Sequence, residues 1–197
     1  MRAGGAALAF VAVSAAVAAG LTRSTDAATL DALQRGADPL LDVAGSILTL
    51  LGRFEVTAAV ALVLAAVAAR RGGIMGAAPL LLFVTVIVEL ALKSIVPQPE
   101  PPQTLSRDLD LLAGPSVDTP FAFPSGHELR TTFLATLATP SGAAWRVAAV
   151  AVVIAMGLTR IYLAQHWASD VTGGLLLGLA FGLAARRPYF DAWRRGR

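Results

Sequence analysis

Residues 144–162 read AWRVAAVAVVIAMGLTRIY, and residues 167–185 read WASDVTGGLLLGLAFGLAA. Both stretches are mostly apolar and close to the roughly 20 residues that an α-helix needs to cross a bilayer. In the second, Gly174, Gly178 and Gly182 recur at four-residue spacing, a pattern that lets two membrane helices approach closely. We therefore predict two spanning helices, the second of them packed tightly inside a bundle.

The composition of the whole chain extends this prediction. Of 197 residues, 56% are hydrophobic and 15% are charged, and the mean hydropathy is +0.67. Soluble domains carry about 25% charged residues, so we expect an integral membrane protein. Such a chain leaves little sequence for a separate soluble domain, which predicts a single membrane domain over residues 1–197.

The predicted fold is an all-α bundle of six transmembrane helices, at residues 3–21, 54–70, 74–96, 127–139, 144–162 and 167–185. The fourth is short for a lone span, so we expect it to begin in a pocket between its neighbours. Residues 26–52 predict an amphipathic helix on the membrane surface between the first and second spans. Residues 3–21 also have features of a secretory signal, but the run is longer than a signal core, and we favour an uncleaved anchor.

The positions of Lys and Arg predict the orientation, because cytoplasmic loops are enriched in positive charge. With both termini cytoplasmic, the inner arginines are Arg2, Arg70, Arg71, Arg146, Arg186, Arg187, Arg194, Arg195 and Arg197. The loops at 22–52, 97–126 and 163–166 then face outward. The stretch 97–124 holds seven of the eleven prolines, so we predict an external loop with little helix there.

Two kinds of function are disfavoured by composition. The chain has no cysteine, which excludes a disulfide framework, a zinc–thiolate site and a thiol nucleophile. The net charge is only +3 and many arginines flank apolar runs, so membrane topology explains the basic excess better than nucleic-acid binding does.

The sequence Pro-Ser-Gly-His at 124–127 lies where the proline-rich loop meets the fourth predicted span. One interpretation is structural, because Ser125 with Glu128 three residues later makes a capping-box pattern. That interpretation does not explain Gly126 or His127. A helix start with a glycine and a hydroxyl offers N–H groups to an anion, and a histidine there can exchange protons with it. We favour the anion-site interpretation.

The second histidine lies in the segment from Arg160 to Asp170, read RIYLAQHWASD. His166 and Asp170 are four residues apart and would share a helix face, so the carboxylate can orient the imidazole for nucleophilic attack. The alternative is a cluster that only anchors a helix end at the membrane interface. From this segment alone both interpretations stay open.

Lys93 ends the third predicted span on the same outer side, one turn after Glu89. Alone, it is equally well explained as a snorkelling lysine with an i,i+4 partner. We expect Lys93 to lie at the same face of one bundle as both histidines, Asp170 and Arg160. This convergence favours a functional site, because ionisable groups at membrane depth are costly.

Together these residues resemble a known family. Lys93, the Pro-Ser-Gly-His segment, and Arg160 with His166 and Asp170 are similar in order and spacing to the three-part signature of the type 2 phosphatidic acid phosphatase superfamily. The resemblance includes the six-span layout and covers most of residues 3–185. It implies a metal-independent, cofactor-free hydrolase, a lipid phosphate or diphosphate phosphatase that works through a phosphohistidine.

The resemblance also implies a role for each matching residue. His166 would attack phosphorus, Asp170 would orient it, and His127 would protonate the leaving oxygen and later deprotonate water. The phosphoryl oxygens would be held by a set of donors, namely Lys93, Arg160, the Ser125 hydroxyl and the Gly126 N–H.

One position departs from the family pattern. The first motif is Lys-x6-Arg-Pro, and here Glu100 stands where the arginine is expected, followed by Pro101. A carboxylate there would repel phosphate. Either Arg107 or Arg130 supplies the missing charge, or Glu100 faces away from the phosphate, or the protein has lost turnover. We favour a working enzyme, because the nucleophile, acid and orienting positions are intact.

The expected substrate is amphiphilic, namely phosphatidic acid, phosphatidylglycerol phosphate or a polyprenyl diphosphate. The expected location is a bacterial plasma membrane, with the active site on the external face and membrane lipids as the other partners. A family member without turnover that binds phospholipid headgroups or a membrane partner is the alternative. The oligomeric state is not indicated by the sequence.

Overall fold

A computed structural model describes residues 2–112, 119–138 and 142–195, and every regular element in these ranges is helical. The α-helices are α1 (Ala3–Ala18), α2 (Arg23–Gln34), α3 (Pro39–Thr49), α4 (Phe54–Gly72), α5 (Leu81–Ile95), α6 (Gly126–Ala138), α7 (Ala143–Tyr162) and α8 (Ala168–Arg195). Three 3-10 helices join them, η1 (Leu50–Gly52), η2 (Gly73–Leu80) and η3 (Gln103–Leu105). The all-α membrane fold predicted from sequence is confirmed.

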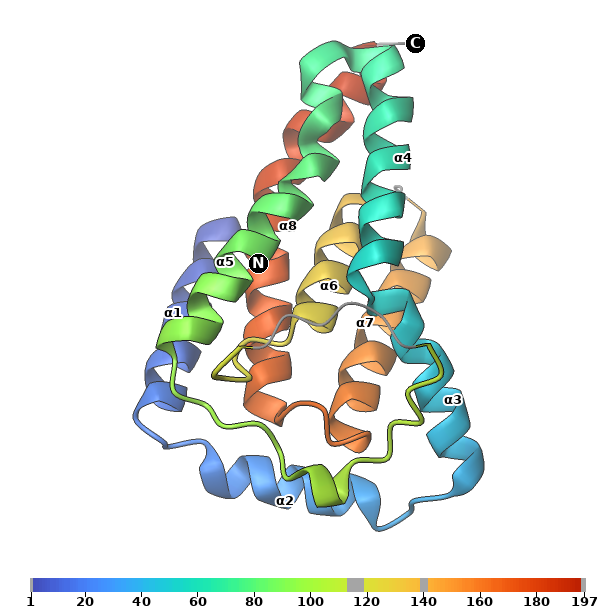
Figure 1. Cartoon of the computed structure of the whole chain (residues 1–197). Coiled ribbons are helices and arrows are strands. Elements are labelled where there is room, and N and C mark those ends of the chain that lie inside the picture. The colour runs from blue at the N-terminus through green and yellow to red at the C-terminus, as the bar shows by residue number, and fades with distance from the viewer. Residues whose placement is uncertain (1, 113–118, 139–141, 196–197) are drawn as a thin grey trace.

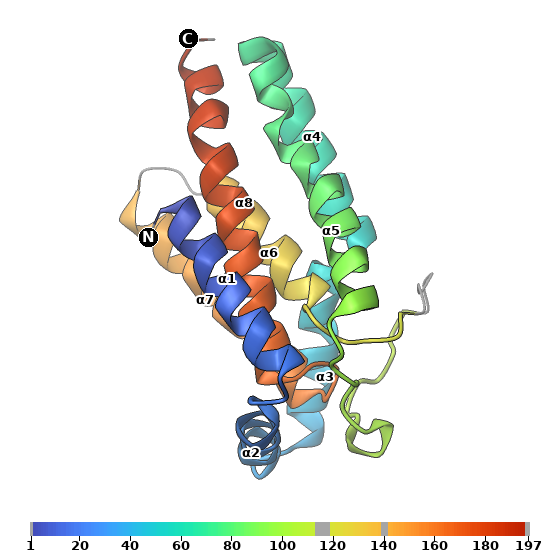
Figure 2. The ribbon, with the colours of Figure 1, turned by 90° about the vertical axis from the view of Figure 1, so that its left-hand side faces the viewer.

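The long helix α8 runs through the bundle, with α1 and the short α6 beside it (Figures 1 and 2). Helices α4 and α5 pair through η2 and reach the far end near the C-terminal part of α8. Helix α2 lies across the opposite end. This places the ends of α5 and α7 and the start of α6 at the same end of the bundle as α2.

A glycine allows the chain to turn from α1 into α2. Gly20 has φ of +70°, in the left-handed region that glycine adopts at little cost. The N–H of Gly20 donates to the Val17 carbonyl and that of Leu21 to the Ala16 carbonyl, which closes the helix end as a Schellman motif. The two helices consequently meet at 96°.

The prediction of one amphipathic helix over residues 26–52 is wrong in its extent. Residues 35–38 interrupt it, because Asp38 caps a new helix by accepting from the Leu40 N–H, and Pro39 occupies the first turn, where its missing donor is harmless. Helix α3 packs against α7, and its extension through η1 meets α4 at 44°. Only α2 lies across the bundle end.

The glycine stripe of α8 is the surface on which α6 packs. A Cβ atom at Gly174 would collide with the Ser125 carbonyl, and one at Gly178 with the backbone of α6. At Gly182 a Cβ atom would lie 2.7 Å from the Cβ of Thr136. The predicted close helix contact is confirmed, and α6 is its partner.

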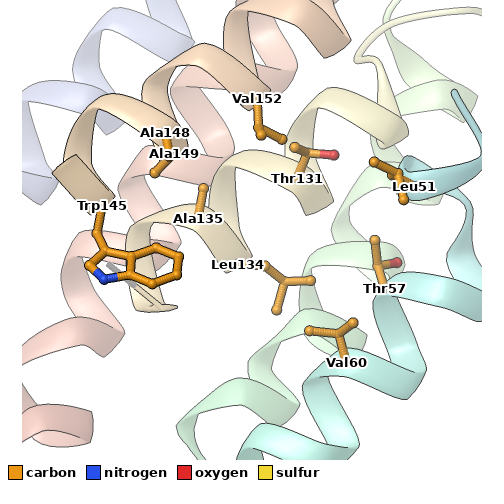
Figure 3. Close-up of a pocket in the computed structure, with 10 residues that line it drawn as sticks. All are labelled: Leu51, Thr57, Val60, Thr131, Leu134, Ala135, Trp145, Ala148, Ala149 and Val152. Atoms are coloured by element: carbon orange, nitrogen blue, oxygen red, sulfur yellow. The ribbon is translucent and has the colours of Figure 1, made fainter. Parts of the chain in front are cut away.

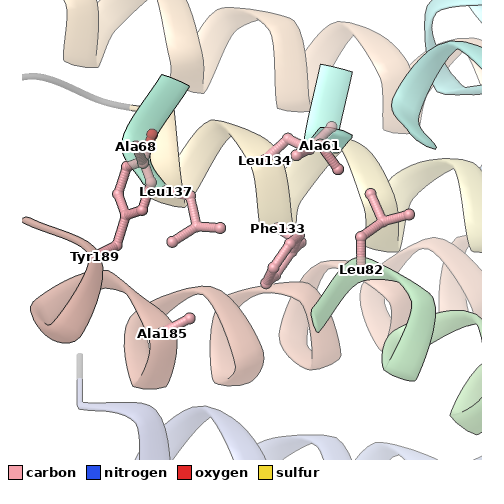
Figure 4. Packing of buried hydrophobic residues seen from close by; sticks show 8 residues of the cluster. All are labelled: Ala61, Ala68, Leu82, Phe133, Leu134, Leu137, Ala185 and Tyr189. Carbon is pink, nitrogen blue, oxygen red and sulfur yellow. The ribbon is translucent and has the colours of Figure 1, made fainter. Parts of the chain in front are cut away.

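A cluster of buried apolar side chains from α4, α5, α6 and α8 lies in the interior of the bundle (Figure 4). The cluster consists of Ala61, Ala68, Leu82, Phe133, Leu134, Leu137, Ala185 and Tyr189. A second cluster around Phe123 and Leu129 attaches α1 to α8. Small and large residues alternate in the first cluster, so the helices approach closely around Phe133.

The outer surfaces of the helices are apolar, as lipid contact requires. Ile87, Val147 and Ile154 are more than half exposed. Among the described residues, three helical segments are long and apolar enough to span a bilayer, namely Gly76–Ile95, Ala143–Tyr162 and Ala168–Arg186. Up to five spans result if each bent helix pair counts as one. The chain is an integral membrane protein, while the count of six spans stays a prediction.

The proline-rich loop is largely non-helical where it is described, apart from η3, and residues 113–118 of it lie outside the described residues. Hydrogen bonds to residues elsewhere in the chain hold its backbone across the bundle end. Trp167 donates to the Pro99 carbonyl, Gln34 to the Leu105 carbonyl, and the Arg107 N–H to the Leu163 carbonyl.

Changing Gly178 to alanine tests the α6–α8 contact. The added Cβ atom would overlap the α6 backbone, so we expect Gly178→Ala to cost about 1–3 kcal/mol. The melting temperature of the detergent-solubilised protein should fall by several degrees. Gly4→Ala is the matched control, because nothing lies within 4 Å of its added Cβ atom. Equal melting temperatures for the two variants would contradict the packing role.

Candidate active site

A cavity of about 430 Å³ opens where α5 and α7 end and α6 begins. Its walls come from α3, η1, α4, α5, α6, α7, the segment between α7 and α8, and the proline-rich loop. Among the side chains that line it are Lys93, His127, Arg130, Arg160 and His166. Residues from three separate sequence motifs therefore meet in one place.

His166 is oriented by a buried carboxylate. Its Nδ1 lies 3.3 Å from Oδ2 of Asp170, which is fully buried and also accepts the Trp167 N–H at 2.9 Å. A hydrogen bond at Nδ1 fixes the ring and leaves Nε2 for the cavity. The predicted pairing of these two residues is present, but they do not share a helix face, because α8 begins at Ala168 and His166 precedes it.

The surroundings of His166 favour its neutral form. Burial lowers its pKa well below the ordinary range, and the positive charges of Arg160, Lys93 and Arg130 lower it further. A lowered pKa keeps the ring unprotonated at neutral pH. Nε2 then has the lone pair that a nucleophile needs.

The start of α6 brings His127 to the cavity. Gly52 lies against the ring, since a Cβ atom there would be 2.7 Å from Cδ2 of His127. Gly126 allows an equally close approach, because a Cβ atom at that position would collide with the Glu89 carboxylate of α5. Both glycines let backbone and charged side chains gather tightly at the helix start.

The capping-box interpretation of this segment is wrong. The Ser125 hydroxyl is fully buried and has no hydrogen-bond partner in the described part of the chain. Glu128 instead accepts from the Thr132 hydroxyl at 3.2 Å. Ser125 therefore keeps its donor available for a ligand, although neither it nor Gly126 is among the side chains that line the cavity.

Glu89, which the sequence indicates only as a partner of Lys93, contacts two of the cations. Glu89 lies 2.7 Å from Nη1 of Arg130 and 3.5 Å from Nζ of Lys93. Arg130 also donates to the Gly52 carbonyl at 3.3 Å. On the opposite wall, Arg160 donates to the Thr49 hydroxyl at 2.7 Å. Lys93, Arg130 and Arg160 thus hold fixed positions at the cavity, which Arg53 also lines.

The structure separates the two arginines considered as substitutes for the missing family arginine. Arg130 lines the cavity. Arg107 pairs with Asp42 at 3.0 Å and lines a different hollow on the loop side. Glu100 does line the cavity, from an exposed position on the loop. It does not turn away from the site.

Sequence reasoning missed Asp26 as part of this region. Asp26 is buried in α2, and its carboxylate accepts the Ser169 N–H at 2.8 Å and the Ser169 hydroxyl at 2.7 Å. Gln98 lies 3.3 Å from the same carboxylate. These contacts cap the first turn of α8 beside Asp170. No sequence signal marked Asp26, because it read as one of several acidic residues of a surface helix.

An apolar hollow of about 340 Å³ lies beside the cavity, between α4, α6 and α7 (Figure 3). Leu51 and Thr131 border it at one end, next in sequence to Leu50 and Arg130, which line the cavity. The exposed Trp145 lies at another part of its wall. Hydrocarbon can therefore lie close to the charged groups.

Fold and site together define a membrane protein with a cavity that brings two histidines and several cations together. The chain belongs to the PAP2 superfamily, whose family model matches residues 74–194. The fold is similar to that of the crystal structure titled as the first transmembrane PAP2 type phosphatidylglycerolphosphate phosphatase from Bacillus subtilis. The TM-score is 0.70 and the identity 20%, over 96% of each chain. No curated protein matches the chain.

Removing the Asp26 carboxylate tests its structural role. Asp26→Ala leaves the Ser169 donors unpaired, so we expect a loss of about 1–3 kcal/mol and a lower melting temperature in detergent. Asp31→Ala is the control on the same helix, because its ion pair with Arg35 is exposed. If both variants melt alike, the cap at α8 contributes nothing.

Proposed function

We propose that this protein is a membrane lipid phosphatase that hydrolyses a lipid phosphomonoester or diphosphate through a phosphohistidine. One observation carries the proposal: a histidine held at Nδ1 by buried Asp170 faces a cavity shared with a second histidine and several cations. Membership of the PAP2 superfamily supports the same class of reaction.

In the proposed reaction, Nε2 of His166 attacks phosphorus and the bond from phosphorus to the leaving oxygen breaks. His127 gives a proton to that oxygen, so the lipid leaves as an alcohol or a monophosphate. His127 then takes a proton from water, whose oxygen cleaves the N–P bond. Inorganic phosphate is released, and both histidines return to their starting state.

The developing charge is held by a clamp in which Arg130 takes the place of the family arginine. Lys93 and Arg160 line the cavity. The buried Ser125 hydroxyl and the Gly126 N–H do not line it, and they would serve as neutral donors only to a phosphoryl group that enters as far as the start of α6. Support for Arg130 comes from its anchoring by Glu89 at the cavity. Arg107 is excluded from this role in the proposal by its pairing with Asp42.

The proposed substrates are phosphatidic acid, phosphatidylglycerol phosphate and polyprenyl diphosphates. The apolar hollow beside the cavity supports a substrate with a hydrocarbon chain (Figure 3). The placement of the cavity on the external face of a bacterial plasma membrane, with both termini cytoplasmic, rests on the charge distribution of the sequence.

Phosphate release from the three candidate lipids tests the proposed reaction. We expect the purified protein to release phosphate in the presence of a metal chelator. His166→Ala should lower the rate by roughly a thousandfold or more, because the nucleophile is lost. Thr172→Ala, at an exposed position on α8, should behave as the parent protein.

The alternative is a family member that binds phospholipid headgroups without turnover. The placement of Glu100 on the cavity wall favours it, because a carboxylate there opposes phosphate binding. It predicts lipid-phosphate binding with no phosphate release from any of the three substrates. Release that depends on His166 eliminates this alternative, and its absence eliminates the phosphatase.

The role of Arg130 is tested separately. Arg130→Ala should lower the release rate by about a hundredfold to a thousandfold, the usual effect of losing one group that stabilises the transition state. Arg107→Ala should change the rate much less, since that side chain lies outside the cavity. Equal losses in the two variants would show that Arg130 does not bind the phosphoryl group.

A further inference from the structure

Glu128 is a buried carboxyl group that the proposed reaction does not use. It lies in α6, is 1% exposed, and belongs to none of the ion pairs of the described residues. Its Oε1 accepts from Thr132, whereas its Oε2 has no hydrogen-bond partner in the described part of the chain. A buried oxygen without a partner is costly, which points to a missing ligand.

The unpartnered oxygen faces a second apolar groove, on the other side of α6 from the catalytic cavity. Oε2 would lie 3.3 Å from a Cβ atom at Gly157 of α7, and both residues border a groove of about 550 Å³ between α6, α7 and α8. The groove continues along Leu175 and Leu179 to Arg186. From Val171 to Arg186 a helix rises about 22 Å.

The shape of the groove fits one extended hydrocarbon chain. Its lining is almost entirely aliphatic between Glu128 at one end and Arg146 and Arg186 at the other. Ile154 and Leu158 on its edge are about half exposed, so the groove is open to lipid from the side. A membrane amphiphile can therefore enter without crossing the protein.

The carboxyl group selects the head of that amphiphile. A phosphate head and an ammonium head would each have to lose their water at a site that is 1% exposed. A hydroxyl needs only one hydrogen bond, which a carboxyl oxygen can accept. We propose that Glu128 and this groove bind a long-chain lipid alcohol. The choice of an alcohol rests on the proposed phosphatase, because hydrolysis of phosphatidic acid, one of its three proposed substrates, leaves a lipid alcohol.

The test is photolabelling in nanodiscs with a long-chain primary alcohol that carries a diazirine on its chain. We expect labelled peptides from α7 and α8, with labelling blocked by the unlabelled alcohol and not by the alkane of equal length. In Glu128→Ala the alcohol should compete about tenfold more weakly, the effect of losing one hydrogen bond to a buried carboxyl. Glu128→Gln keeps an acceptor and should stay within a few fold of the parent.

Two further variants keep the test decisive. Leu179→Trp fills the groove while leaving Glu128 in place, and it should prevent labelling even if the Glu128 variants fold poorly. Asp31→Ala changes an exposed carboxylate on α2 and should not alter labelling. Labelling that is indifferent to both Glu128→Ala and Leu179→Trp, or that the alkane blocks equally well, overturns the proposal.

The outcome is independent of the phosphatase assay. Alcohol labelling is measured in the parent protein and in His166→Ala, which lacks the proposed nucleophile. Glu128-dependent labelling without any phosphate release would support the alcohol site and refute the proposed reaction. Phosphate release without Glu128-dependent labelling would leave the proposed reaction standing and refute the alcohol site.

Discussion

The contact between α6 and α8 is the constraint on which the site depends. Because Gly174 has no side chain, the Ser125 carbonyl of the helix start can lie against α8. The Ser125 N–H donates to the Asp170 carbonyl at 3.0 Å and fixes the two segments in register. His127 follows in one segment and Asp170 orients His166 in the other. The distance between the proposed acid and nucleophile is thus set by backbone packing.

Buried charges at this end of the bundle are held in place by other buried charges. Glu89 lies between Lys93 and Arg130, and each pairing lowers the cost of burying the other two groups. The Glu89 carboxylate offsets part of the positive potential in the cavity. A phosphoryl group there is therefore attracted less strongly than it would be by the cations alone. Glu100 on the wall weakens this attraction further. The proposed activity therefore depends on Arg130 more than a clamp with the family arginine would.

Periodicity and apolar run length predicted the helices and the α8 glycine contact, because both follow from local sequence. The helix break before Pro39 also has a local sequence signal, but the amphipathic pattern on both sides of it favoured a single helix. For the site, spacing within motifs predicted the pairing of His166 with Asp170. It did not reveal Glu89 as the bridge to Arg130, nor Asp26 as the cap of α8. Those contacts join residues far apart in the chain, and only the packing of α2 and α6 creates them.

Successive residues of an α-helix point about 100° apart, so different residues of α6 face different surroundings. His127 and Arg130 face the catalytic cavity, Leu129 and Phe133 face the buried clusters, and Glu128 faces the outer groove. Cations therefore line the cavity where a phosphate would bind, and a lone carboxyl lines the groove, where a charged phosphate head would have to lose its water. When a lipid loses its phosphate, it is no longer attracted to the cations of the cavity, and its new hydroxyl gains a hydrogen-bond partner in the groove. Neighbouring residues of one short helix can thus separate substrate from product.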